Sequence, residues 1–347
     1  MSVPAQEEAA ARLLSIINSS WMSHATHVAV RLGIADLLHD GPKRIDLLAE
    51  AADCHAASLE RLMRALISLD ICSQDDSGDY GLTPMGRLLC ADSEDSLHAW
   101  TLWWGKYHWP MWSGLQHSIK TGKAARSMIS SKNAFTPFER DAEMASVFNA
   151  AMVELSQPVA RSLIRHYDFS GVTRVVDVGG GHGEILAAIL NANPKMQGTL
   201  HDLPHAIEGA RRHMADMGVA DRCDLVAGDF LASVPGGADL YILKNVLHNW
   251  NDEDSARILG NCRRAMPDHA VLLVVEQFMP ASIEPTSVHR AIVHSDLNML
   301  VTLGAGERGL DQFRQLFRTQ GFTVNRIVPM AMNLNMIECL PGRPSEY

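Results

Sequence analysis

The chain has 347 residues, of which 47% are hydrophobic and 20% charged, and it carries a formal net charge of −10. This composition is that of a globular protein with more than one domain. The acidic balance excludes a basic surface of the kind that attracts nucleic acid or an anionic membrane. No apolar run reaches the roughly 20 residues that span a bilayer. Six scattered cysteines without a C-x-x-C pair and an acidic N-terminus, MSVPAQEEAA, predict a cytoplasmic protein with reduced thiols.

The first part of the chain, from Glu7 to about Leu89, predicts several helices followed by a hairpin. The hairpin turn is Asp75–Asp79, and the helix before it is expected from Ser58 to Leu69. Helices followed by a hairpin form a winged-helix pattern, which serves either DNA binding or packing and dimerisation. The expected recognition helix carries only Arg61 and Arg64 as basic residues, so we favour a dimerisation module.

Aromatic residues gather in the next segment. Five of the seven tryptophans lie within residues 97–112, a pattern typical of a core helix or subunit interface, and also of a wall for a flat aromatic ligand. A helix expected over Phe135–Met152 has Met144, Phe148 and Met152 spaced by four. Such a stripe usually faces a core, although it also suits a pocket wall.

Strands and helices alternate from about Thr173 onward, which predicts a doubly wound α/β sheet. The last two strands are too close in sequence for a parallel crossover, so we expect an antiparallel hairpin at the end. The expected domains are a winged-helix-like unit over 1–95, a helical linker and pocket region over 96–165, and a Rossmann-like domain over 166–347. Strands are predicted at 174–178, 198–202, 223–228, 238–244, 270–278, 322–328 and 335–340.

The run from Val175 to Gly183 is the most informative in the chain. Its valines suit a strand that is covered on both faces, and the strand passes through Asp177 into consecutive glycines. Gly179, Gly181 and Gly183 give G-x-G-x-G rather than the G-x-G-x-x-G of dinucleotide sites. The corner predicts a nucleotide-like ligand, with a tight structural turn as the alternative.

Acidic residues follow the first three strands of this domain. Asp177 ends the first strand, Asp202 the second and Asp229 the third, with Phe230 next to it. Ligands bind at the carboxyl ends of such strands, where Asp202 suits ribose hydroxyls and Asp229 an adenine amino group. One such aspartate is often only a helix cap. Three in succession beside a glycine loop predict an adenosine-containing ligand.

A histidine follows the fourth strand. His248 is expected in the same cleft, and Glu276 at the end of the fifth strand and Glu307 before the last helix are both placed to reach it. A histidine between carboxylates is the arrangement of a general base. The alternative is a satisfied surface or core histidine, with one glutamate a cap and the other a surface charge.

These motifs together resemble the S-adenosylmethionine (SAM)-dependent small-molecule O-methyltransferases of plant phenolic and bacterial natural-product metabolism. The similarity extends over nearly the whole chain. It is carried by Phe148–Met152, Tyr167–Phe169, the glycine loop, His-Asp-Leu-Pro at 201–204, Gly-Asp-Phe at 228–230 and Leu-Lys-Asn-Val-Leu-His-Asn-Trp at 243–250.

The resemblance implies that His248 is the general base and that Glu276 and Glu307 orient its ring. It implies SAM as cofactor, S-adenosylhomocysteine (SAH) as product and a homodimer. No metal is expected, because the sequence has no convincing Asp/Asn cluster of the kind that metal-dependent catechol enzymes need for Mg²⁺. Many relatives have aspartate after the catalytic histidine, where this chain has Asn249. The expected SAM-binding residues are Gly179, Gly181, Asp202, Leu203, Asp229, Phe230 and Lys244, and the expected acceptor-binding residues are Trp104, Met144, Phe148, Met152, Asn298 and Met299.

The acceptor is expected to be a flat aromatic secondary metabolite with a phenolic hydroxyl, with a hydroxyphenazine ahead of polyketide or quinone phenols. Two other functions remain open on the sequence. One is a SAM-binding relative that decarboxylates or hydroxylates its substrate, and the other is a winged-helix regulator that senses a ligand.

Overall fold

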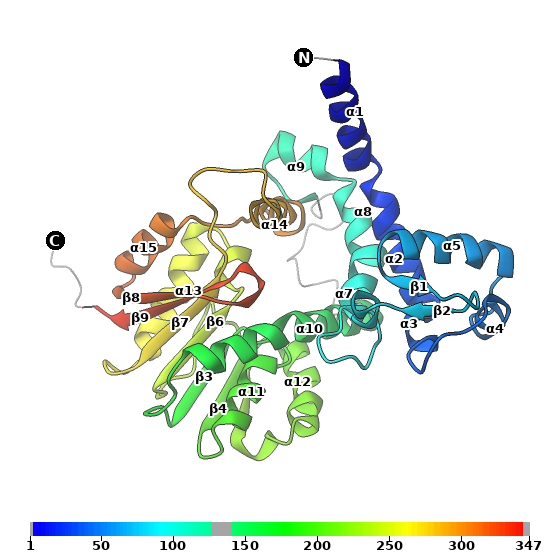
Figure 1. Ribbon diagram of the computed structural model, residues 1–347. Helices are drawn as coiled ribbons and strands as arrows, with labels where there is room; N and C mark the ends of the chain where they lie inside the picture. The colour runs from blue at the N-terminus through cyan, green and yellow to red at the C-terminus, as the bar shows by residue number, and fades with distance from the viewer. Residues whose placement is uncertain (1–2, 126–140, 343–347) are drawn as a thin grey trace. The chain divides into compact units, whose positions relative to one another are not determined.

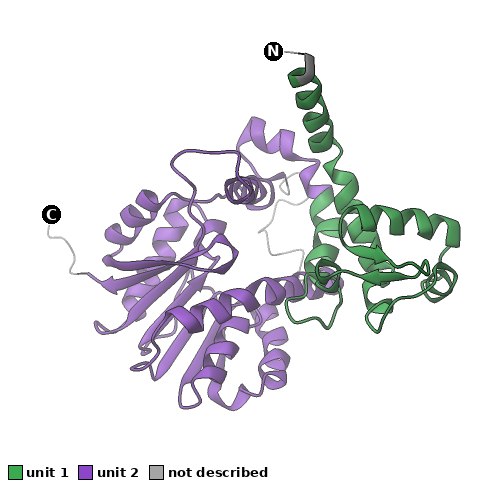
Figure 2. Ribbon diagram, viewed as in Figure 1, with its two compact units in different colours: residues 1–109 green, residues 110–347 purple. Residues whose placement is uncertain are grey.

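The computed structural model describes residues 3–125 and 141–342. Its chain forms two compact units, residues 1–109 and residues 110–347 (Figure 2). The finer division at residues 95 and 165 stays a prediction. In the described part of the chain, no helix combines the length and hydropathy needed to cross a membrane.

The first unit contains the helices and the hairpin that the sequence predicts. Cys72 pairs with Leu82 across the antiparallel hairpin, and the Thr83 hydroxyl accepts the Gly86 N–H at 3.0 Å to cap the helix that follows. Met63 and Leu66 are fully buried in its core. The elements are α1 (Val3–Ile17), α2 (Ser19–Arg31), α3 (Ile34–Leu37), α4 (Ile45–Ala51), α5 (Ala56–Ser68), β1 (Cys72–Gln74), β2 (Tyr80–Leu82), α6 (Pro84–Arg87) and α7 (His98–Trp103).

Large apolar side chains stand exposed on α1 and the start of α2. Leu13, Ile16, Ile17 and Trp21 are 58%, 62%, 63% and 69% exposed, respectively. We call these four residues the apolar face of α1–α2. Several exposed large apolar side chains so close together in the sequence are typical of a protein–protein interface.

The tryptophan-rich segment is helical but not uniformly α-helical. A π-helical stretch, η1 (Trp104–His108), joins α7 to α8 (Trp109–Trp112). Trp103 and Tyr107 are buried, with ring centroids 5.2 Å apart. The prediction of a core helix is therefore confirmed for these two side chains.

The second unit is built on a seven-stranded sheet with the order β5-β4-β3-β6-β7-β9-β8. The first five strands along this order are parallel, and β9 is antiparallel to both β7 and β8. This confirms the doubly wound sheet and the final hairpin. The strands are β3 (Arg174–Val178), β4 (Gln197–Asp202), β5 (Cys223–Ala227), β6 (Leu240–Lys244), β7 (Val271–Glu276), β8 (Phe322–Pro329) and β9 (Asn335–Pro341).

Helices cover both faces of this sheet (Figure 1). One face packs against α10 (Ala142–His166), α11 (Glu184–Ala192) and α12 (Pro204–Asp216), and the other against α13 (Asp252–Ala265) and α15 (Leu310–Thr319). Burial on both faces explains why the parallel strands are continuous apolar runs. The unit also contains α9 (Leu115–Thr121) and α14 (Ser287–Leu303).

The helix predicted over Phe135–Met152 differs from the observed α10. Asp141 lies outside the helix because its carboxylate accepts the Met144 N–H at 2.9 Å and caps the first turn. The helix then continues beyond Met152 to His166. Residues 135–140 of the prediction lie outside the described residues.

The topology sets the place of a ligand site. The chain runs outward from β3 to β4 and β5, and then returns to β6 on the other side of β3. In open α/β sheets the ligand crevice lies at such a switch point, outside the carboxyl ends of the strands. The loops after β3, β4, β6 and β7 therefore meet at one edge.

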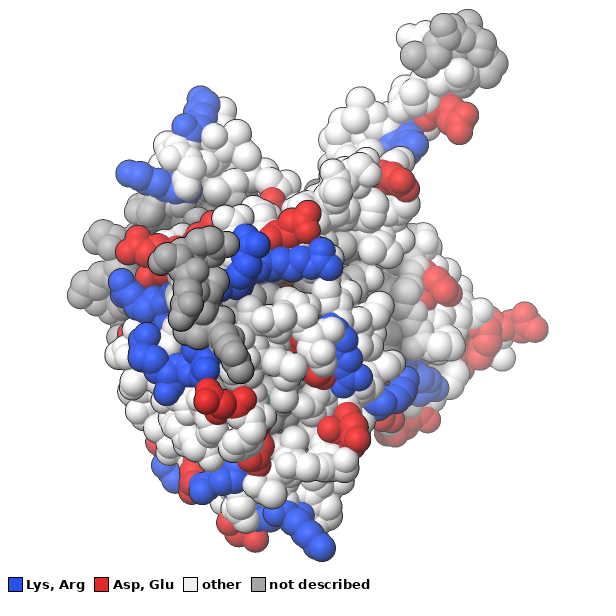
Figure 3. All heavy atoms as spheres, turned by 90° about the vertical axis from the view of Figure 1, so that its left-hand side faces the viewer, with Lys and Arg blue, Asp and Glu red and all other residues white. Residues whose placement is uncertain are grey.

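Side chains of both charge signs are interspersed over the face shown in Figure 3, which therefore presents no broad field of one sign among its described residues.

All six cysteines are free thiols, and Cys72, Cys90, Cys262 and Cys339 are buried.

Candidate active site

The glycine loop between β3 and α11 has a backbone that favours glycine. Gly179, Gly181 and Gly183 have φ angles of 72°, 60° and 84°. A Cβ on Gly179 would lie 3.0 Å from the Val246 side chain and 3.2 Å from Phe230, whereas one on Gly181 would have nothing within 4 Å. The loop therefore packs against Phe230 on one side and is open at Gly181.

Asp202, the last residue of β4, is bonded to this loop. Its Oδ2 accepts the Gly181 N–H at 2.8 Å and its Oδ1 accepts the Leu203 N–H at 2.6 Å. Burial raises the pKa of Asp202, although these two hydrogen bonds oppose the rise. The structure thus brings together Gly181, Asp202 and Leu203, three of the predicted SAM-binding residues.

Asp177 is buried on β3, and Lys244 is half-buried at the end of the neighbouring strand β6. Burial, with the nearby Asp202 charge, raises the pKa of Asp177 to about 7, and its Oδ2 has no hydrogen-bond partner among the described residues. Burial lowers the pKa of Lys244 to about 8, against the opposing effect of Glu276 and Asp177. The Lys244 Nζ donates to Ser156 Oγ at 3.1 Å, which joins β6 to α10.

Asp229 lies two residues beyond β5 and is exposed. Its Oδ1 accepts the Leu231 N–H at 2.8 Å, so it shapes the turn that carries Phe230. The Phe230 ring meets Trp250 edge-on, with centroids 5.8 Å apart.

His248 lies on a short 3-10 turn, η5 (Leu247–Asn249), directly after β6. Glu276 Oε1 accepts the Leu247 N–H at 2.8 Å and the His248 N–H at 3.4 Å. Asn249 donates its side-chain N–H to the Asn245 carbonyl at 3.0 Å. An aspartate at position 249 has no such donor when ionised, so the asparagine suits this turn.

Both predicted carboxylates reach the His248 ring. Nδ1 lies 3.2 Å from Glu307 Oε1 and 3.6 Å from Glu276 Oε2. The His248 side chain is 12% exposed, whereas the two glutamate side chains are buried. Because carboxylates accept hydrogen bonds, the proton of a neutral imidazole belongs on Nδ1, which leaves the Nε2 lone pair available.

The pKa values follow from this enclosure. Burial alone lowers the pKa of His248, but Glu276 and Glu307 outweigh it, so the pKa lies above its ordinary value. Burial raises the pKa of Glu276. Burial also opposes ionisation of Glu307, but hydrogen bonds from His248 and Ser295 hold its pKa below the ordinary value.

The same three side chains have a donor set that suits a cation. His248, Glu276 and Glu307 each offer one ligand atom, and these atoms lie within 4.8 Å of one another. Oε2 of each glutamate has no hydrogen-bond partner among the described residues. One imidazole and two carboxylates are a donor set that can bind Zn²⁺. The effect of a chelator on the reaction rate therefore distinguishes a metal site from a general base.

Several residues that the sequence analysis did not single out support this cluster. Ser295 on α14 donates to Glu307 Oε1 at 2.7 Å, and Asp296 accepts the Glu307 N–H at 2.8 Å. Arg308 donates to the Leu247 and Trp250 carbonyls, each at 2.7 Å. The only sequence signal for Arg308 is its position beside Glu307.

The predicted acceptor-binding residues lie on several elements. Trp112 Nε1 donates to Asn298 Oδ1 at 3.1 Å, and Met299 follows on α14. Trp104 belongs to the first unit, where its ring lies 4.7 Å from that of His108. Met144, Phe148 and Met152 are half-buried along α10.

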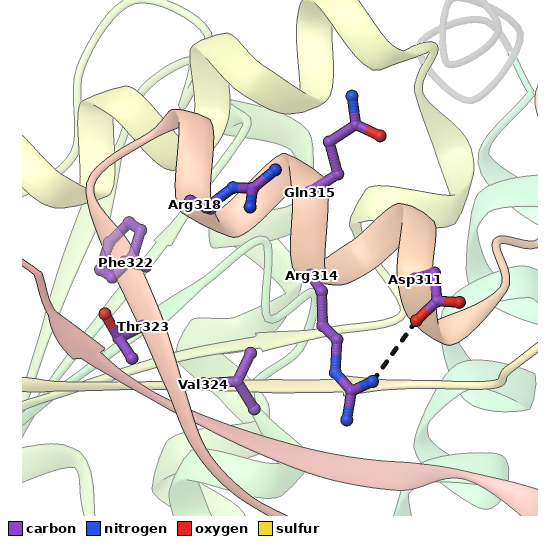
Figure 4. A pocket seen from close by; sticks show the side chains of 7 residues that line it. All are labelled: Asp311, Arg314, Gln315, Arg318, Phe322, Thr323 and Val324. Carbon is purple, nitrogen blue, oxygen red and sulfur yellow. Dashed lines mark hydrogen bonds and ion pairs between the residues drawn. The ribbon is translucent and has the colours of Figure 1, made fainter. Parts of the chain in front are cut away.

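A hollow of about 450 Å³ lies elsewhere, between α15 and β8 (Figure 4). Arg314 and Arg318 line it from the helix, and Phe322 and Val324 line it from the strand. None of the predicted site residues lines it, so it is separate from the His248 cluster.

Comparisons with known proteins identify the family of the chain. Residues 112–323 match the family model for an O-methyltransferase domain, and residues 14–92 match that for an O-methyltransferase dimerisation domain. The chain is 38% identical to a phenazine O-methyltransferase, PhzM, of Lysobacter antibioticus, over 95% of each chain. It is 31% identical to phenazine-1-carboxylate N-methyltransferase of Pseudomonas aeruginosa, over 95% of this chain and 96% of that one.

A solved structure extends the comparison to the cofactor. The methyltransferase CalO1 of calicheamicin biosynthesis, in its SAH-bound form, matches with a TM-score of 0.83 and 31% identity, over 99% of this chain and 100% of that one. With the family models, this shows both the fold and the cofactor. The chain therefore belongs to the O-methyltransferase family and is a SAM-dependent O-methyltransferase.

Proposed function

We propose that the enzyme methylates a phenolic hydroxyl of a flat aromatic secondary metabolite, with His248 as the general base. The observation that carries this proposal is the pairing of His248 Nδ1 with two buried carboxylates. That pairing leaves Nε2 to accept the hydroxyl proton. The carboxylates then stabilise the imidazolium that forms.

A phenol substrate needs a base because its pKa is far above neutral pH. A phenol with a pKa near 10 is almost entirely neutral at pH 7, so its oxygen is a weak nucleophile. His248, with a pKa raised above its ordinary value by Glu276 and Glu307, is a stronger proton acceptor than a free imidazole. The same shift requires a pH high enough to keep the ring neutral.

The loop residues fit the cofactor. When bound, SAM supplies a methyl group on a positively charged sulfur, which leaves as a neutral thioether. The loop is open at Gly181, where a Cβ would meet no atom within 4 Å, and Asp202 beside it keeps lone pairs free after accepting two N–H groups. Asp177 has a buried oxygen without a hydrogen-bond partner among the described residues. These residues, with Phe230 next to Gly179, form a polar and aromatic surface that suits an adenosine group.

A relative that methylates nitrogen makes N-methylation the second candidate. An aromatic nitrogen attacks through its own lone pair and needs no proton removed first. A histidine paired with two buried carboxylates serves a substrate that must lose a proton, so this cluster favours oxygen. The decarboxylating and hydroxylating alternatives have no such support from the relatives named above, which are all methyltransferases.

A hydroxyphenazine is the acceptor that we propose first, because a relative with 38% identity is a phenazine O-methyltransferase. The flat ring is expected to meet Met144, Phe148 and Met152 of α10 and Asn298 and Met299 of α14, and the role of Trp104 stays a prediction from the sequence. We place the enzyme in the cytoplasm, where its six free thiols stay reduced.

Methyl transfer is tested with SAM and a panel of phenols that includes 1-hydroxyphenazine, analysed by mass spectrometry. We expect a gain of about 14 mass units, one CH₂, on a hydroxyl oxygen, because His248 acts on a proton that only the hydroxyl carries. Exclusive methylation of a ring nitrogen across the panel would contradict the proposal, as would loss of CO₂ or gain of oxygen.

A chelator separates proton from metal chemistry in the same assay. We expect EDTA to leave the rate of methylation unchanged, because Glu276 and Glu307 are proposed to accept the Nδ1 proton of His248 in a hydrogen bond and not to bind a metal. Strong inhibition that added Zn²⁺ or Mg²⁺ reverses would show instead that the cluster acts through a metal.

We propose that two copies of the chain associate through the first unit, through the apolar face of α1–α2. Its residues Ile16 and Trp21 are 62% and 69% exposed, which is costly in water. Light scattering after size exclusion is expected to give twice 38.1 kDa for the wild type. Ile16→Glu with Trp21→Glu is expected to give a monomer, whereas Ile119→Glu on α9, which is equally exposed, is expected to leave the dimer intact. A dimer that survives the double substitution would place the interface elsewhere.

A further inference from the structure

Arg308 is a buried cation with an unusual set of partners. Its side chain is only 7% exposed, and a guanidinium at such a position is costly unless its N–H groups are bonded. Nη1 donates to the Leu247 carbonyl at 2.7 Å, and Nη2 donates to the Trp250 carbonyl at 2.7 Å and to Ser255 Oγ at 3.1 Å. Nε donates to Asp252 at 2.8 Å. Both carbonyl partners belong to one short stretch of main chain.

That stretch is the turn that carries His248. Leu247 and Trp250 bracket the histidine, and Ser255 Oγ adds weaker bonds to the same two carbonyls at 3.3 and 3.4 Å. On the opposite side, Glu276 accepts the N–H groups of Leu247 and His248. The turn is therefore held by a buried cation on its carbonyls and a buried anion on its N–H groups.

We infer that Arg308 is a positioning residue for His248, which fixes the main chain of the turn so that the ring meets Glu307 and Glu276. The inference rests on the proposed role of His248 as base. Glu307 and Arg308 are neighbours, so one loop holds both the ring and the backbone of the same histidine. Arg308 reaches the two carbonyls through two separate nitrogens, Nη1 and Nη2, and the single ammonium nitrogen of a lysine does not offer this fork.

A purely structural role would also explain a buried arginine, and Arg222 provides the matched comparison. Its Nη1 donates to the carbonyls of Leu190, Asn193 and Met196 at 2.9, 3.4 and 3.3 Å. It thus holds the connection between α11 and β4 as Arg308 holds the turn, but it touches no predicted site residue. Loss of either arginine is expected to lower the melting temperature.

The test compares Arg308→Ala, Arg308→Lys and Arg222→Ala. For both Arg308 variants we expect kcat to fall by about 10²-fold, the usual effect of a small misplacement of a reacting group. The Kd for SAM and the KM for the acceptor are expected to change by about twofold at most, because binding is not what Arg308 serves. Millimolar guanidinium is expected to restore part of the kcat of Arg308→Ala. Arg222→Ala is expected to keep its kcat and to ignore guanidinium.

A double substitution separates this inference from the proposed function. Arg308→Lys added to His248→Ala is expected to cost less than about twofold beyond His248→Ala alone, because a residue that acts through His248 has nothing left to position. A further loss as large as in the wild-type background overturns the inference and leaves the base intact, as does a kcat of Arg308→Lys equal to that of the wild type. Full turnover of His248→Ala overturns the proposed function itself. Arg308→Lys keeps the positive charge, so it serves where Arg308→Ala does not fold.

Discussion

His248→Ala is expected to lower the turnover number by on the order of 10²–10⁴-fold, the usual contribution of a positioned general base. The Nε2 lone pair that is proposed to accept the hydroxyl proton is then absent. SAM affinity is expected to stay within about twofold, because the substitution leaves the glycine loop and Asp202 untouched. Single-turnover rates and calorimetric SAM binding check the two expectations separately.

The size of the deficit should depend on pH. As the pH approaches about 10, a phenol ionises without help, so the variant is expected to approach the wild type. A deficit that stays constant up to that pH would assign the loss to binding or folding instead.

Removal of the histidine also leaves two buried carboxylates without their partner, which costs about 3–5 kcal/mol when a buried pair is broken. His248→Gln, which keeps a polar group at the site, therefore accompanies the alanine variant. His213→Ala is the matched control, because His213 lies 2.8 Å from Glu184 in another partly buried histidine–glutamate pair. We expect His213→Ala to keep its turnover number. A loss equal to that of His248→Ala would contradict the role of His248 as the general base.

Glu307→Gln is expected to lower turnover on the order of 10²-fold and to move the pH dependence. In the wild type, the pKa of His248 lies above its ordinary value, so kcat rises with pH as the ring loses its proton above pH 6.5. The glutamine lacks the charge that favours the imidazolium. The pKa of His248 therefore falls, and the rise in kcat moves to lower pH.

The measurement is kcat against pH for the wild type, Glu307→Gln and Glu338→Gln. Glu338 is the control, because it is buried on β9 and is bonded to Arg326 and Asn325 rather than to His248. We expect Glu338→Gln to keep the wild-type profile. If the rise of kcat with pH stays in place in Glu307→Gln, or moves to higher pH, this carboxylate does not control the pKa of His248.

Features with a local cause could be predicted from the sequence. The run Val175–Val178 and the glycines after it define a buried strand and a turn, and both are observed. Glu276 ends β7, and its place there follows from the apolar run before it. The hairpin of β8 and β9 follows from the short link between them.

Features that depend on contacts between distant segments could not be predicted. Arg308 meets Leu247 across 61 residues, and nothing local to either residue signals the contact. The same holds for Ser295, which reaches Glu307 from another element. The predicted start of α10 differs from the observed one, because the apolar spacing in the sequence does not signal the cap. The Asp141 carboxylate caps the first turn, and α10 begins at Ala142. The π-helical stretch at Trp104–His108 has the same apolar spacing as an α-helix over so few residues.

The role of His248 as base is tested by a crystal structure of the enzyme with SAH and the phenol that the mass assay identifies as acceptor. We expect His248 Nε2 within about 2.6–3.2 Å of the hydroxyl oxygen, with Nδ1 still hydrogen-bonded to Glu307. A hydroxyl that instead meets another side chain, with the imidazole turned away from it, would contradict the claim.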